Sequence, residues 1–555
     1  MSRHHSNSNS LVRECAGHAR PLNGSRLLAG LLVLNGLALL LVSVWFRVDG
    51  VGHIPGVNGD EAWYGVQAVE LLRGGSPSWQ TPTGNPLNPG FFVPMVLLHS
   101  VCPPSIVLLR AVAVLSGLAT LAVNAWLCRW VFDRRTAVLS TLVLAVLPVP
   151  LAYSRFAWDA SQSVLVTLPV LYFSLAAVRF LERQARLLLA AAIAAMAAFL
   201  VHPANLFAGL LLVPALLHPE TRAAVKRRAS GLLGYWPVVL ALAAVVGGML
   251  IGWLVWGDSS AALITADRLD GLTQMTEPGY AAAITTLYPR LFLGATVYRS
   301  LAGSTSWLQW PYLAGNVWGL DVLLFWPALL AAGWVLWHRS SQLRTDRALI
   351  VGAVLQLAAF LLLAGPRALV PGYERYALCL IAPAVLIAAR AAVVWCNDRP
   401  KRWRCSLVIG SLAGWFLLAD FDRHYFHFIE QTGGEAHPTF RTAPVEPKQA
   451  ALQRILDQRR GEPTWIVTST WWNYWSLRYM AMGEPEVRVL LPEEAEAATG
   501  FSQARRQGRV WYVEFSDSEQ ARGVRRQLRG AALDEWQIPD YGGRPVLSVL
   551  RSRGP

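Results

Sequence analysis

Long apolar segments separated by short polar ones recur along most of the chain. A helix of about 20 apolar residues is long enough to cross the roughly 30 Å hydrocarbon core of a membrane. The pattern predicts a polytopic α-helical membrane protein with about eleven transmembrane helices, whose membrane domain covers residues 26–420. The expected spans lie near residues 26–47, 106–130, 136–153, 160–180, 187–201, 203–217, 232–256, 314–337, 348–364, 375–396 and 405–419. Because no A-x-A-like cleavage site follows 26–47, that segment is interpreted as a retained anchor.

Basic residues decide whether 187–217 forms one long helix or two short helices that meet at His202-Pro203. Cytoplasmic loops of membrane proteins carry an excess of Lys and Arg. With two helices, every loop on one side is basic, whereas a single helix would put later basic loops on the wrong side. These loops are FDRR (132–135), RFLERQAR (179–186), HPETRAAVKRR (218–228), HRSSQLRTDR (338–347) and NDRPKRWR (397–404). We therefore expect residues 1–25 to form a cytoplasmic tail and the C-terminus to lie outside the cytoplasm.

The pattern changes beyond residue 420, where the long apolar runs stop. Segments 464–470, 486–491 and 509–515 are typical of strands, and 518–530 is typical of a helix. These segments predict a small α/β domain at 432–555, which begins with a linker at 432–447. The topology places this domain on the extracytoplasmic side.

Composition agrees with a membrane protein and excludes some other classes. The chain is 54% hydrophobic and 15% charged, which is too apolar for a single soluble core. The basic cytoplasmic loops explain much of the net charge of +14, so the charge does not argue for nucleic-acid binding. None of the six cysteines has a CxxC spacing, and no disulfide framework or zinc site is indicated.

Acidic residues begin a helix in the first predicted outer loop, residues 48–105. The helix is expected to end at Gly74-Gly75, with Asn58 or Asp60 as its N-cap and with Asp60 and Glu61 in its first turn. One interpretation is structural, because acids at a helix start contribute about 0.3–1 kcal/mol through the helix dipole. A catalytic interpretation gains weight from a second acid, Asp159, at another outer helix start.

The catalytic interpretation gives these acids different roles. A charged side chain costs about 2.5–3.5 kcal/mol at the bilayer centre, so acids near a membrane usually lie where water or substrate reaches them. Asp60 is suited to accept a proton from a hydroxyl group. Glu61 points about 100° away around the helix and is expected to orient or bind an acceptor.

Arginines on the same side could bind a phosphate, because their planar guanidinium groups match its oxygens. Arg375 and Arg155 are the main candidates. Arg290 and Arg299 lie in the predicted outer loop 257–311, where interfacial snorkelling is the favoured alternative.

Other polar and aromatic residues are candidates for contacts with substrate or metal. His202 could join Glu277, Asp60 and Glu61 in a divalent-metal site, although their spacing is not diagnostic. For His202 a helix-end position is the alternative. Trp63, Tyr64 and Trp158 could contact a sugar, while the other Trp residues are expected in interface belts or in the domain core.

The order of three motifs, GDEAWYG (59–65), YSRFAWDAS (153–161) and YERYALCLIAP (373–383), resembles the C superfamily of glycosyltransferases (GT-C). The resemblance is to the branch that contains dolichyl-phosphate-mannose protein mannosyltransferases and lipid A aminoarabinose transferases. It implies the GT-C fold, Asp60 as catalytic base with Glu61 as its neighbour, Asp159 as a second acid, and Arg375 and Tyr376 near the donor phosphate.

The same resemblance implies a substrate class. The donor would be a polyprenyl-phosphate-linked sugar, transferred with inversion to a lipid, glycan or protein acceptor. No cofactor or metal is obligatory, and a bacterial inner membrane is the expected location.

Two other functions share part of this pattern. A transporter or lipid-linked glycan flippase would place ionisable residues mid-helix, and Asp321 is the clear acid inside an apolar run. A glycan ligase or polymerase that uses polyprenyl diphosphate would share the topology, and the acid-pair motif distinguishes it. A scaffold that displays residues 420–555 would leave the outer acids without a purpose.

Overall fold

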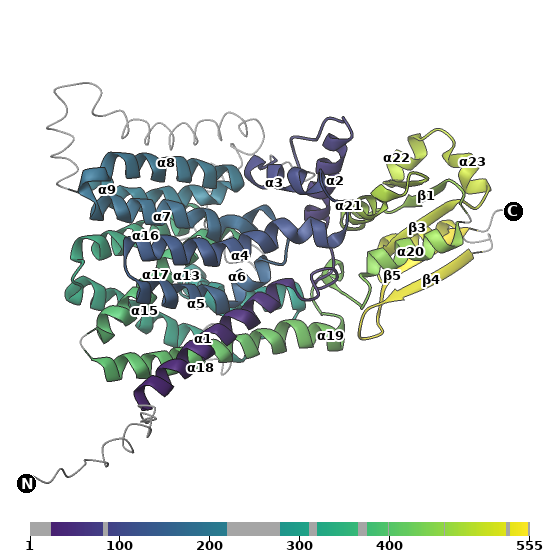
Figure 1. Cartoon of the computed structure of the whole chain (residues 1–555). Helices are drawn as coiled ribbons and strands as arrows, with labels where there is room; N and C mark the ends of the chain where they lie inside the picture. Colours follow the sequence, from purple (N-terminus) through teal and green to yellow (C-terminus); the bar gives the residue numbers. More distant parts are fainter. Residues whose placement is uncertain are drawn as a thin grey trace, which may run out of the picture.

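The computed structural model describes residues 24–81, 87–218, 278–309, 319–364, 374–397, 399–459, 461–528 and 533–552. A bundle of helices carries a smaller α/β domain at one of its ends (Figure 1). Helix α1 (Gly24–Val48) begins at the opposite end of the bundle. The start of α1 and the C-terminal domain therefore lie at opposite ends of the bundle.

The described part of the chain has eight helices that are long and apolar enough to cross a membrane. The chain is therefore an integral membrane protein, whereas the predicted count of about eleven spans is not reached among the described residues. The predicted span 232–256 lies outside them. The eight segments are Leu27–Val48, Ile106–Val131, Asp159–Arg179, Leu181–Val201, Leu320–Arg339, Leu343–Leu362, Arg375–Cys396 and Lys401–Thr432.

Two proline positions explain how the remaining apolar segments divide. Helix α8 (Gln184–Val201) ends before His202, and a 3-10 segment (Pro203–Leu212) with α9 (Val213–Leu217) follows. This confirms the two-segment interpretation of 187–217. The predicted span 136–153 divides at Leu147 into α5 (Arg134–Val146) and α6 (Pro148–Tyr153). Leu147 is extended because a residue that precedes proline disfavours the α region.

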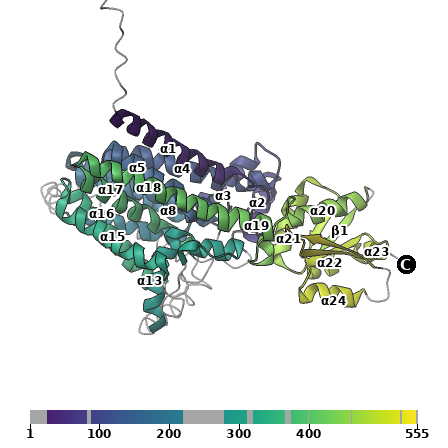
Figure 2. The ribbon, with the colours of Figure 1, turned by 90° about the horizontal axis from the view of Figure 1, so that it is seen from below.

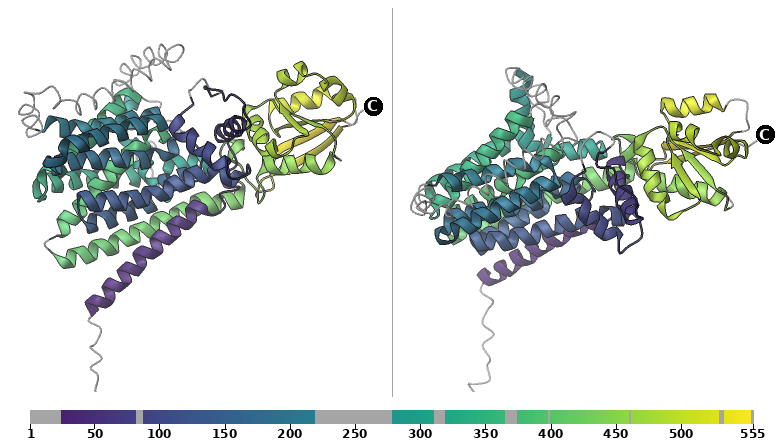
Figure 3. Two further views of the ribbon diagram at one scale, coloured as in Figure 1. Left: turned by 45° about the horizontal axis from the view of Figure 1, so that its top comes forward. Right: turned by 90° about the horizontal axis from the view of Figure 1, so that it is seen from above.

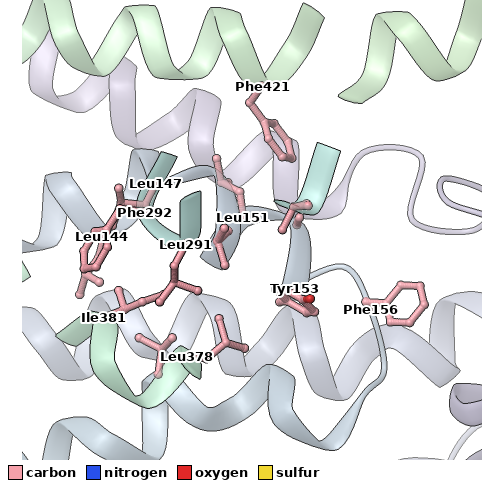
Figure 4. Packing of buried hydrophobic residues seen from close by; sticks show 14 of the residues in the cluster. Leu144, Leu147, Leu151, Tyr153, Phe156, Leu291, Phe292, Leu378, Ile381 and Phe421 are labelled. Atoms are coloured by element: carbon pink, nitrogen blue, oxygen red, sulfur yellow. The ribbon is translucent and has the colours of Figure 1, made fainter. Parts of the chain in front are cut away.

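Short helix α6 lies at the centre of the bundle. All six of its residues are buried. Apolar side chains of α13 (Pro278–Leu293), η8 (Glu374–Leu380), α17 (Ile381–Cys396) and α18 (Pro400–Phe421) pack in the same cluster (Figure 4). Leu151 of α6 is in this cluster with Leu291, Leu378, Ile381 and Phe421. This packing fixes the segment that follows α6, residues 154–162.

The C-terminal domain is a mixed five-stranded sheet in the order β2-β1-β3-β5-β4. Strand β1 (Thr464–Val467) pairs in parallel with β2 (Val487–Leu490) and β3 (Val510–Phe515). Strand β5 (Pro545–Ser552) pairs antiparallel with β3 and β4 (Leu533–Pro539). The segments expected to be strands each contain one of β1, β2 and β3.

Helices cover both faces of this sheet. Helices α20 (Pro447–Gln458) and α21 (Trp471–Met480) pack on one face, and α23 (Phe501–Arg506) and α24 (Glu519–Gln527) on the other. Figure 2 shows α20 and α24 on opposite sides of the sheet. The predicted helical segment 518–530 contains α24.

The first loop docks directly on the C-terminal domain through helix α2 (Gly59–Leu72), which packs against α21 (Figure 3). Glycines make this close approach feasible. A Cβ atom at Gly59 would lie 2.8 Å from the Trp471 ring, and one at Gly65 would lie 2.6 Å from the Tyr479 ring. Since Gly59 meets the start of α21 and Gly65 meets its end, the N-termini of the two helices lie at the same end of the contact.

Gly65→Ala tests this docking. The new methyl group would clash with Tyr479, and overpacking of this kind costs about 1–3 kcal/mol. We expect a lower Tm in detergent and faster protease cleavage of the linker 432–447. Gly333→Ala is the matched control because its Cβ would meet no atom within 4 Å. Equal Tm values for the two variants would contradict the docking.

Candidate active site

Asn58 caps helix α2 and leaves the Asp60 carboxylate free. The Asn58 side chain accepts a hydrogen bond from Asp60 N at 2.7 Å, and Asn58 N donates to Glu61 Oε1 at 2.8 Å. This capping box satisfies backbone donors at the helix start. Of the two caps expected from the sequence, the structure therefore selects Asn58, and capping does not use the Asp60 side chain.

Glu61 forms a fully buried ion pair with Arg110 of α4 (Ile106–Val131). Arg110 Nη2 lies 2.6 Å from Glu61 Oε1, and Arg110 Nε lies 3.0 Å from Oε2. Oε2 also accepts from Ala157 N at 3.2 Å. Both carboxylate oxygens are therefore occupied, and the expectation that Glu61 binds or orients an acceptor is not supported.

Arg110 also holds the loop that leads into α2. Its guanidinium donates to the carbonyl oxygens of Val51 at 3.0 Å, Pro55 at 2.9 Å and Gly56 at 3.2 Å. Sequence reasoning missed Arg110, and its only signal was a charge near the start of an apolar run. From the other side, Glu446 Oε1 accepts from Val57 N at 3.1 Å, so the C-terminal segment clamps the same loop.

Asp60 lies in a largely buried, charged environment. Burial is the main cause that raises the pKa of Asp60 to about 6; the guanidinium of Arg375 opposes this rise, and the carboxylates of Asp159 and Glu61 add to it. No hydrogen bond to its carboxylate comes from the part of the chain that the structure describes. Asp60 is thus a mostly ionised acid at neutral pH with oxygens available to a substrate.

Asp159 is held by donors from the first loop. Its Oδ2 accepts from Asn88 Nδ2, and from the Tyr64 hydroxyl at 3.4 Å, while Oδ1 accepts from Ala160 N at 2.7 Å. Burial keeps the pKa of Tyr64 well above its usual value, so this hydroxyl stays protonated and can donate. Asn88 was not identified from the sequence. Its contact shows that Tyr64 and Asn88 position Asp159.

Arg375 lies over an aromatic ring. Its Cζ is 4.2 Å from the centroid of the Trp158 ring, and its Nη2 donates to the Tyr376 hydroxyl at 3.2 Å. The Tyr376 ring stacks on His202 with centroids 5.1 Å apart. The structure therefore brings together Trp158, His202, Arg375 and Tyr376, and Trp158 supports the guanidinium.

Other expected site residues lie elsewhere. Trp63 is buried in the core between α2 and α3 (Pro89–His99), where apolar side chains pack around it. Arg155 is also fully buried: it donates to the carbonyl oxygens of Phe46 and Ile54 and lies over the Phe426 ring. Neither position supports the expected contact with substrate, because packing and backbone carbonyls already occupy these side chains.

The remaining candidates belong to the segment around the fourth predicted outer loop. Arg290 is half-buried on α13, near the acid Asp321 of α15 (Leu320–Arg339). Arg299 is exposed. Glu277, proposed as a metal ligand, lies outside the described residues. Within the described ranges, no three Asp, Glu, His or Cys side chains are grouped to hold a metal ion.

Glu61→Ala tests the structural role of Glu61. Removing one partner of a buried ion pair leaves an uncompensated charge and costs about 3–5 kcal/mol. We expect a large fall in the free energy of unfolding. The control is Glu70→Ala on the same helix, since the Glu70–Arg478 pair is partly exposed and worth under about 1 kcal/mol. A Glu61→Ala protein as stable as the control would refute this role.

Sequence comparison finds neither a matching family model nor a matching curated protein. Solved structures do match. ArnT from Cupriavidus metallidurans in the apo state has a TM-score of 0.53 at 15% identity, with 95% of this chain and 99% of ArnT covered. The Archaeoglobus fulgidus oligosaccharyltransferase in complex with Zn and sulfate has a TM-score of 0.50 at 16% identity, with 87% of this chain and 68% of that chain covered. These structural neighbours are GT-C glycosyltransferases, and this chain has their fold.

Proposed function

We propose that the protein is a membrane glycosyltransferase that moves a sugar from a polyprenyl-phosphate donor to a lipid, glycan or protein acceptor. One observation carries this proposal: Asp60, Asp159 and Arg375 come from separate segments, their charges act on one another, and Arg375 lies over Trp158, the residue before Asp159. The GT-C fold supports it. A bacterial inner membrane is the proposed location. The site is proposed to face the extracytoplasmic side because the loops expected on the other side are rich in Lys and Arg.

Asp60 is the proposed general base. As the acceptor oxygen attacks the anomeric carbon, its proton passes to the Asp60 carboxylate, and the sugar–phosphate bond breaks on the opposite face. The anomeric configuration inverts. A base with a pKa of about 6 binds this proton more strongly than an ordinary aspartate, yet it is still ionised at neutral pH. Asp159, already hydrogen-bonded to Asn88 and Tyr64, contributes negative charge beside the sugar.

Arg375 and Tyr376 are the proposed ligands of the leaving phosphate. The Tyr376 oxygen accepts a hydrogen bond from Arg375. A phenol O–H and a guanidinium are both donors suited to phosphate oxygens. Stacking on Trp158 and His202 orients both side chains before the substrate binds. A guanidinium in a water-poor site stabilises a departing phosphate strongly, and this is how the site would lower the barrier.

A lipid-linked donor suits a site at the end of an apolar bundle. ArnT from Cupriavidus metallidurans has also been solved bound to undecaprenyl phosphate. A divalent cation bound here would take Asp60 and Asp159 as carboxylate ligands and would neutralise the phosphate.

Asp60→Asn should abolish transfer without weakening the fold. A positioned base contributes a factor of about 10²–10⁴ in rate, which the variant should lose. In the wild type, kcat/KM should fall as the pH drops below about 6, because Asp60 then becomes protonated. Burial favours the protonated form of Asp60, so ionisation between about pH 4 and pH 6 lowers stability and the neutral Asn should keep or raise the Tm at pH 7. Transfer is measured with purified protein and lipid-linked sugars extracted from membranes. Normal turnover by the variant would remove Asp60 as the base.

Arg375→Ala should weaken binding of undecaprenyl phosphate. Loss of a charge-assisted hydrogen bond costs about 1.5–3 kcal/mol, which corresponds to roughly 10- to 100-fold in Kd. Native mass spectrometry of the purified protein with added undecaprenyl phosphate measures this. Arg299→Ala is the matched control because Arg299 is exposed. An equal effect of both substitutions would contradict the role of Arg375.

A further inference from the structure

The order in which successive strands join the C-terminal sheet reverses at strand β1. The chain runs from β1 to β2 on one side and returns to β3 on the other, and both neighbours are parallel to β1. Helix α21 follows β1 on one face of the sheet, and α24 follows β3 on the opposite face. In α/β sheets, ligands bind beyond the carboxyl ends of the strands at such a switch point.

Unpartnered polar groups gather at this edge. Thr468 follows β1, Thr470 is the N-cap of α21, Asn473 is in the first turn of α21, and Glu514 is near the end of β3. Glu514 Oε1 accepts from Ser469 N at 2.6 Å, so its carboxylate faces the loop between β1 and α21. These four residues, Thr468, Thr470, Asn473 and Glu514, are called the switch-point site.

Several buried polar atoms of the switch-point site have no hydrogen-bond partner in the described structure. Within the described residues, these atoms are the hydroxyl oxygens of Thr468 and Thr470, the side-chain Nδ2 and Oδ1 of Asn473, and Glu514 Oε2. Thr468, Asn473 and Glu514 are fully buried. An unsatisfied buried polar group costs about 1–3 kcal/mol, so a native fold rarely keeps several together unless a ligand or water satisfies them.

The charges around the site select the chemistry of its ligand. The Glu514 carboxylate repels an anion, and the N-terminus of α21 carries partial positive charge that disfavours a cation. Hydroxyl groups both donate and accept, and so they match a carboxylate oxygen, an amide and two threonine hydroxyls. A neutral, hydroxyl-rich ligand therefore fits best. Burial raises the pKa of Glu514 to about 7, so a substantial fraction of this side chain is still ionised at neutral pH.

The site lies beside the segment that carries the candidate base. Trp471, the residue after Thr470, packs against Gly59, the residue before Asp60. Helices α2 and α21 begin at the same end of their contact. We propose that the switch-point site binds a neutral sugar unit of the acceptor, next to the segment that carries Asp60. That the bound sugar belongs to the acceptor rests on the proposed function.

Hydrogen exchange of the full-length protein in detergent tests this proposal. The probes are glucose, mannose, galactose and N-acetylglucosamine, with sodium phosphate and calcium chloride as charged alternatives. At least one sugar should slow amide exchange at least twofold in peptides that cover 468–474 and 510–516, and neither salt should do so. Protection by a salt alone, or by no probe, would overturn the proposal, because the groups would then bind an ion or only water.

Substitutions make the test specific. Glu514→Gln should raise the half-maximal sugar concentration about tenfold, which corresponds to loss of one charged hydrogen bond. The control Glu519→Gln on α24 should behave as wild type, and unchanged sugar binding by Glu514→Gln would refute the site. If Glu514→Gln unfolds, Asn473→Asp replaces it and should show the same loss. Asp60→Asn should retain sugar binding, so failure of the base assignment and failure of this site give different results.

Discussion

The buried ion pair between Glu61 and Arg110 is the interaction on which the candidate site depends. Two charges removed from water are tolerated only when hydrogen bonds satisfy them fully. Here the carboxylate accepts from Arg110, Asn58 N and Ala157 N, while the guanidinium also donates to carbonyls of the loop before α2. One pair thus joins α4, the start of α2 and the segment that contains Trp158 and Asp159. Because these elements are joined, Asp60 has a fixed position relative to Asp159.

The C-terminal domain completes this framework. Glu446 binds the backbone of Val57, and the aromatic side chains of α21 press against glycines of α2. A side chain at either glycine would force the two helices apart, since protein interiors pack too tightly to absorb an extra methyl group. The C-terminal domain therefore helps to hold the loop and helix that carry Asp60.

Three acids near one another perform three different tasks. Glu61 is neutralised by Arg110, Asp159 is held by Asn88 and Tyr64, and Asp60 keeps its oxygens free within the described structure. Burial and nearby like charges raise the pKa of Asp60, so of the three acids Asp60 is the one suited to accept a proton near neutral pH. Arg375, supported on Trp158, supplies the opposite charge.

The sequence alone was enough to predict many of the helices and strands, because these depend on neighbouring residues. Apolar length indicated the membrane helices, the proline at 203 marked a helix boundary, and short runs of β-branched and aromatic residues indicated three strands of the C-terminal sheet. Only the tertiary structure decided which polar residue does what. Asp60 and Glu61 are adjacent in the chain, yet Glu61 meets Arg110 and Asp60 does not. The reason is physical: helices and strands follow from contacts between near neighbours and from contact with lipid or water, whereas the role of a charge depends on which distant group neutralises it.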